Sequence, residues 1–117
     1  MAGTIVADAW KNGDGTENYK CRAWVSFVGV GTVTIKASGN VSSITDNGVG
    51  FYKVNFTNNF PDTNYSISGA AEATDASAQA FVGVVNGGIA LDGVTIKSMD
   101  AAGALLDFPT VCVQVFR

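Results

Sequence analysis

The strongest pattern in the chain is the stretch TVTIKASGNVSSITDNGVGFYKVNF, residues 32–56. At its start Val33, Ile35 and Ala37 alternate with polar residues, and this period of two is typical of a β-strand. The dipeptide Asn47-Gly48 follows, which is common in tight hairpin turns because both residues tolerate a positive φ. The stretch therefore predicts one strand, a second strand that ends at a hairpin, and a return strand.

The same alternation continues on both sides of this stretch, interrupted by turns that contain Gly, Asn or Asp. It predicts eight strands, at residues 22–28, 32–37, 40–46, 49–56, 64–71, 79–85, 89–97 and 110–116. Phe27, Phe56 and Phe81 fall on apolar faces and are core candidates. No window has the period of a helix, so we expect a single all-β domain over residues 21–117, an antiparallel β-sandwich of jelly-roll type. We interpret residues 1–20, which lack the alternation, as an arm or an irregular first strand.

The chain carries little charge for its hydrophobicity. Of its 117 residues, 47% are hydrophobic and only 15% are charged, with a net charge of −3, whereas charged residues make up roughly 25% of a typical soluble domain. We therefore expect part of the surface to be buried against other copies. The seven Lys and Arg residues are scattered, so nucleic acid and anionic membranes are not expected as partners. No apolar run is long enough for a bilayer span or a signal peptide, and we expect synthesis in a cytoplasm.

The chain contains no histidine. This absence removes the commonest general base, the Ser–His and Cys–His nucleophile systems and the usual zinc ligand sets. We therefore expect no enzymatic activity, no cofactor and no metal site. Half of the carboxylates fall in predicted turns, where aspartate caps backbone amides; these are Asp14, Asp46, Asp62, Asp75 and Asp100. Residues 12–17 are rich in oxygen atoms but lack the ligand positions of an EF-hand, and we interpret them as a solvated turn.

The two cysteines, Cys21 and Cys112, lie near opposite ends of the chain. A disulfide requires the first and last strands to be neighbours. The alternative is that both are buried, reduced thiols that behave as small apolar residues.

Several segments together resemble one protein family. They are RAWVSF (22–27), GTVTIKAS (31–38), NVSSITDNGVG (40–50), YKVNF (52–56), PDTNY (61–65) and VQVFR (113–117). They are similar to a module at the C-terminal ends of phage tail-fibre and tailspike proteins, including those of marine and cyanobacterial phages. The resemblance implies a β-sandwich knob, commonly a trimer, on the outside of a virion, and it carries over no catalytic residues. Phe51 departs from the pattern, since the family often has Asp or a small polar residue there.

The length of the chain suggests where such a knob would be mounted. With 117 residues as the whole protein, residues 1–20 are too few to form a fibre shaft. We therefore expect a homotrimeric capsid decoration (cement) protein on the exterior of the phage particle, with the major capsid protein as its partner. Contacts with the capsid or with neighbouring subunits are expected at Ile5, Val6, Trp10, Trp24 and Phe51.

A second interpretation is a receptor-binding protein at the tip of a tail fibre or tailspike, with a tail protein and a host surface glycan as partners. Tyr52, Asn58 and Asn59 are the candidate glycan contacts, because aromatic rings stack on sugars and amides hydrogen-bond to hydroxyl groups. A third, a polysaccharide-cleaving enzyme, would need two carboxylates facing each other across a cleft.

Overall fold

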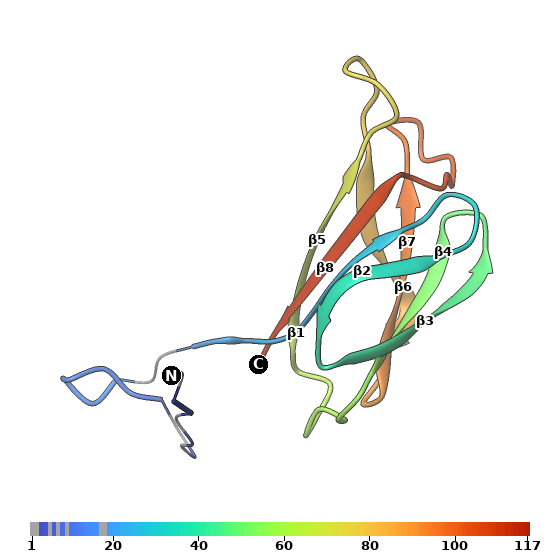
Figure 1. The fold of residues 1–117 in the computed structure, drawn as a ribbon. Helices are drawn as coiled ribbons and strands as arrows, with labels where there is room; N and C mark the ends of the chain where they lie inside the picture. Colours follow the sequence, from blue (N-terminus) through green and yellow to red (C-terminus); the bar gives the residue numbers. More distant parts are fainter. Residues whose placement is uncertain (1–2, 5, 7, 9, 17–18) are drawn as a thin grey trace.

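The computed structural model describes residues 3–4, 6, 8, 10–16 and 19–117 of the chain. Its eight strands form two four-stranded antiparallel sheets, with orders β2-β1-β8-β5 and β3-β4-β7-β6 (Figure 1). The strands are β1 (Cys21–Val28), β2 (Thr34–Gly39), β3 (Val41–Gly48), β4 (Phe51–Phe56), β5 (Ser66–Glu72), β6 (Phe81–Ile89), β7 (Gly93–Met99) and β8 (Thr110–Phe116). All eight predicted strands are present, and the prediction of an all-β sandwich is confirmed.

The core lies between the two sheets and is built from the alternate residues of their central strands. In β1 and β8 every second residue is buried, as is every second residue of β4 and β7. The side chains with essentially no exposed surface include Phe27, Tyr52, Val54, Ile96, Phe108 and Val113. Along one edge the sheets approach closely, because a Cβ added at Gly69 in β5 would lie 2.9 Å from the Cγ1 atom of Val82 in β6.

The strand order differs from that of a jelly roll, in which consecutive strands alternate between the two sheets. Here β1–β2, β3–β4 and β6–β7 are hairpins that each stay within one sheet. The last strand, β8, fills the gap between β1 and β5 and is antiparallel to both. The jelly-roll part of the prediction is therefore wrong, because period-two patterning specifies strands but not which of them pair.

Three local predictions from the sequence need correction. Ala37 is exposed, because β2 carries a bulge between its pairs with Ser26 and Phe27, and one extra residue turns the next side chain to the opposite face. The β3–β4 loop is Val49-Gly50, two residues after the predicted turn. Phe81 is 49% exposed rather than in the core.

The two cysteines are free. Strands β1 and β8 are indeed neighbours, but Cys21 lies opposite Phe116 whereas Cys112 lies opposite Ser26. The thiols are thus about five residues apart along the strand pair, roughly 17 Å, far beyond the Cα separation that a disulfide allows. The interpretation as free, reduced thiols is confirmed, but the expectation that both are buried is wrong, because Cys21 is exposed and Cys112 is half-buried.

Candidate interaction surfaces

The aspartates of the turns are used to build those turns. Each of the five predicted caps accepts a hydrogen bond from the backbone N–H two residues later, at Thr16, Gly48, Asn64, Ser77 and Ala102. The side chain of Ser77 lowers the pKa of Asp75, and that of Thr16 lowers the pKa of Asp14. Such carboxylates stay ionised at neutral pH, which is the opposite of what a general acid requires.

Residues 12–16 belong to the oxygen-rich segment that the sequence analysis interprets as a solvated turn. They form a tight turn in which the Asn12 N–H donates to the Thr16 carbonyl over 2.8 Å, and both the N–H and the hydroxyl of Thr16 donate to Asp14. The Asp14 carboxylate is thus occupied by the turn itself. Glu17 lies outside the described residues. Among the described residues, no group of three His, Cys, Asp or Glu side chains is placed to hold a metal ion.

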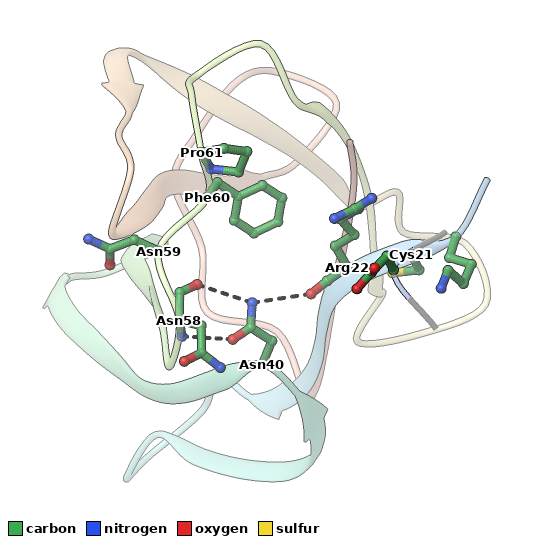
Figure 2. Close-up of a pocket in the computed structure, with 9 residues that line it drawn as sticks. Cys21, Arg22, Asn40, Asn58, Asn59, Phe60 and Pro61 are labelled. Atoms are coloured by element: carbon green, nitrogen blue, oxygen red, sulfur yellow. Dashed lines mark hydrogen bonds between the residues drawn. The ribbon is translucent and has the colours of Figure 1, made fainter. Parts of the chain in front are cut away.

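A polar pocket of about 420 Å³ lies where the arm meets the sandwich (Figure 2). It is lined by Asp8, Lys20, Cys21, Arg22, Asn40, Asn58, Asn59, Phe60 and Pro61. Asn40, a non-glycine residue with φ of 55°, begins the return from β2 to β3. Its side-chain amide donates to the carbonyls of Arg22 and Asn58, and its side-chain oxygen accepts the Asn58 N–H at 2.8 Å. These bonds tie the loop after β4 to the first strand.

The loop after β4, which lines the pocket, is held in place by the packing of aromatic rings. The Phe60 ring lies 4.7 Å from the ring of Phe56 and 4.9 Å from that of Tyr65, and all three are buried. The same loop is joined to the end of the chain, because Arg117 makes a two-pronged contact with Asp62 at 2.8 and 2.7 Å. This contact with Arg117 is the main reason why the pKa of Asp62 is lowered to about 2. Two of the segments that carry the family resemblance therefore meet at this end of the sandwich.

The three predicted glycan contacts are not brought together. Asn58 and Asn59 are exposed and line the polar pocket. Tyr52 has no exposed surface, and its hydroxyl bonds to Asp107 and to the carbonyl of Gly29 near the opposite end of β4. Burial raises the pKa of the Tyr52 hydroxyl, with Asp107 as the second cause. The prediction for Tyr52 is wrong: it is a core residue, because it shares the inward face of β4 with Val54 and Phe56.

The described part of the arm presents apolar side chains to solvent. Val6 is 91% exposed, Trp10 44% and Tyr19 80%, and the arm lies outside the sandwich in Figure 1. The ammonium group of Lys20 lies over the ring of Trp10, 5.6 Å from its centroid. Ile5, the remaining predicted arm contact, lies outside the described residues. Sequence analysis did not single out Tyr19, although an aromatic residue in an arm without alternation is a signal that could have done so.

The other two predicted contacts lie on opposite faces of the sandwich. Trp24 is 41% exposed on the outer face of the β2-β1-β8-β5 sheet, where its indole packs so closely on Gly39 that a Cβ there would be 2.4 Å from the Nε1 atom. Phe51 is half-buried and pairs with Lys97 in the other sheet. A single flat contact therefore cannot include both residues.

A second group of exposed apolar side chains was not predicted from the sequence. Phe81 and Leu105 are exposed by 49% and 39%. Met99 pairs with both Phe81 and Leu105, so this outer apolar cluster spans the β6–β7 ladder and the loop before β8. Its members come from three separate segments, and only the pairing of those segments brings them together.

Comparisons of this chain with protein-family models, with curated proteins and with solved structures gave no match. In the described part of the chain, no helix has the length and apolar character needed to cross a membrane.

Proposed function

We propose that this chain is a non-enzymatic structural protein of a bacteriophage particle, a homotrimeric knob that decorates the outside of the capsid. The observation that carries the proposal is the division of the chain into a closed sandwich and an arm whose apolar side chains the sandwich does not cover. The core contains none of the described arm residues. Val6 and Tyr19 are almost fully exposed, and large apolar side chains held in water favour burial against another protein.

The arm has the properties of an anchor. Trp10 and Tyr19 are amphipathic rings of the kind that dominates binding energy at protein interfaces. A trimer presents three such arms to one surface, and linked arms raise the overall affinity well beyond that of one arm.

The chemistry of the sandwich supports a structural role. Five of the eight aspartates are occupied as turn caps, and three of these five have lowered pKa values. Together with the family resemblance of residues 22–65 and of the last strand, this supports an appendage of a virion that acts through surface contact.

The experiment is a binding assay with phage heads assembled without this protein. The full-length chain is compared with a Trp10→Ala/Tyr19→Ala variant and with the control Phe81→Ala, which removes an aromatic ring of similar exposure from the sandwich. We expect the arm variant to lose at least about tenfold in affinity, since each buried aromatic anchor contributes on the order of 2 kcal/mol. The control should bind like the unchanged chain.

Equal binding by the arm variant and the unchanged chain would refute the role of the arm. Cryo-electron microscopy of the virion tests the location directly: hundreds of copies on the head support the proposal, and a few tens or fewer on the tail contradict it.

The polar pocket favours a second candidate function, a receptor-binding tip that recognises host glycan. Asn58, Asn59 and Arg22 are among the residues that line the pocket, and amides and guanidinium groups are suitable partners for sugar hydroxyl and carboxylate groups. An Asn58→Ala/Asn59→Ala variant should then lose host-cell adsorption, whereas capsid binding would be unaffected. Unchanged adsorption by this variant would eliminate the pocket as a receptor site.

A further inference from the structure

The outer face of the β2-β1-β8-β5 sheet is poor in charged side chains. We call it the neutral face. Its large side chains are Trp24 and Phe116, exposed by 41% and 42%. The pairing register surrounds them with small or uncharged residues, namely Ser26, Ala37, Gly39, Ser66, Ser68, Ala70, Cys112 and Gln114.

The polar groups of the neutral face are largely bonded to one another. The Cys112 thiol contacts the Ser26 hydroxyl at 3.6 Å, and the Ser68 hydroxyl donates to the Gln114 side chain at 3.1 Å. Because these groups already have partners on neighbouring strands, covering them removes few hydrogen bonds to water, and the desolvation cost is small.

The face also contains one pair of opposite charges, which are linked through a hydroxyl group. The Lys36 ammonium group donates to the Thr110 hydroxyl, which in turn donates to Glu72 at 2.9 Å. The charges cancel across the face. The outer face of the other sheet is different, because it carries Lys97 in addition to Lys53, whose charge is paired with that of Asp92 at 3.3 Å.

We propose that the neutral face is the surface through which copies of this chain contact each other, an inference that rests on the homotrimer of the proposed function. Each copy has a net charge of −3, so copies repel unless they meet across surfaces without net charge. A face without net charge meets this condition for an identical partner. A different protein of opposite charge would instead be attracted to the charged faces.

The direction of the face fits this occupant. Four strands of six to eight residues cover a flat area of about 19 Å by 24 Å. This area of about 460 Å² is smaller than the roughly 800 Å² per partner of a standard-size interface, so a contact through this face belongs to the small class. The strands run from the arm end of the sandwich to its far end (Figure 1), so copies packed side by side on this face can keep all their arms at one end.

The test introduces a charge at Ala70, which is exposed on β5, an edge strand of this sheet, and pairs with Cys112 of β8. Full-length Ala70→Lys and Ala70→Glu are compared with Thr45→Lys, which places the same charge on an exposed position of β3, an edge strand of the other sheet. Sedimentation velocity gives the oligomeric state, and circular dichroism checks that each variant keeps its β spectrum. The labelling rate of the Cys112 thiol provides a second measure.

We expect the unchanged chain and Thr45→Lys to sediment as trimers. Both Ala70 variants should weaken association, and Ala70→Glu should lower the association constant the more, by about 100-fold or more, because its charge would be buried beside that of Glu72 on the same face of β5. Cys112 should label faster in the Ala70 variants than in the unchanged chain. Folded Ala70 variants that remain trimeric with Cys112 protected would overturn the inference and leave the trimer itself intact. A monomeric unchanged chain would refute both the trimer and the neutral face. A trimer that fails to bind phage heads would contradict only the proposed location on the capsid.

Discussion

Replacing Gly50 with alanine should destabilise the fold much more than the same change at Gly31. The two glycines have nearly the same backbone conformation, with φ of 62° and 63°. Their surroundings differ: a Cβ at Gly31 would meet no atom within 4 Å, whereas one at Gly50 would lie 2.6 Å from the Ser98 carbonyl oxygen and 2.8 Å from the Leu106 nitrogen. Gly31→Ala is therefore a matched control for the cost of the left-handed conformation.

The expected magnitudes follow from these contacts. A left-handed conformation costs an L-residue roughly 1–2 kcal/mol, and the lower entropy of the unfolded alanine chain offsets about 0.4–1 kcal/mol of this. For Gly31→Ala we expect a loss of about 1 kcal/mol or less. At Gly50 the obstructing atoms belong to the backbone, and overpacking adds roughly 1–3 kcal/mol. We therefore expect a loss of about 2–4 kcal/mol for Gly50→Ala.

The backbone of Gly50 also contributes hydrogen bonds that the clash would disturb. Its N–H donates to Asp107 at 2.8 Å and its carbonyl accepts from the Ser98 N–H at 2.9 Å. The assay is urea denaturation followed by circular dichroism, with all variants at one protein concentration because assembly shifts the apparent stability. If Gly50→Ala lost no more stability than Gly31→Ala, the close packing of residues 98 and 106 on the β3–β4 loop would be refuted.

Three further changes test other parts of the structure. Tyr52→Phe keeps the core ring but removes the hydroxyl that donates to Asp107; we expect a loss of about 1.5–3 kcal/mol in urea denaturation, and an unchanged midpoint would contradict the bond. Tyr65→Phe removes the hydroxyl that bonds to the β6–β7 turn, so hydrogen exchange of that turn should accelerate while the exchange of β1 and β8 stays slow. The third change concerns the Asp62–Arg117 contact. The folded pKa of Asp62 is lowered to about 2, below the ordinary unfolded value of about 3.9, so the stabilisation is present above pH 4 and is lost as the pH falls toward 2. Asp62→Asn should reduce this acid sensitivity, measured as the thermal midpoint against pH, and an identical pH profile would count against the contact.

The proposed function and the neutral face assign different tasks to different parts of the molecule. In these two proposals the arm, with Trp10 and Tyr19, contacts the capsid shell, and the neutral face joins the copies. Trp24, predicted as a capsid or subunit contact, belongs to the neutral face, whereas Phe51 lies on the opposite sheet. The two tasks can therefore be tested by separate substitutions.

Much of the fold could be predicted from the sequence because strand formation is governed by local patterns. Alternating side chains, turn glycines and capping aspartates act within a few residues of each other. This is why all eight strands were predicted, and why five turn aspartates were correctly assigned as caps before any pairing was known. The absence of histidine is likewise a property of composition and needs no coordinates.

Pairing and burial depend on residues that are far apart in the chain, and these required the tertiary structure. A single bulge in β2 turned Ala37 outward, and the position of β6 left Phe81 at the surface, although both residues obey the alternating pattern of an inward face. The neutral face, the outer apolar cluster and the clamp between Asp62 and Arg117 each join segments separated by many residues. Sequence patterning specifies which side chains alternate, but the strand order selects which neighbours they meet, since the same pattern is compatible with several pairings.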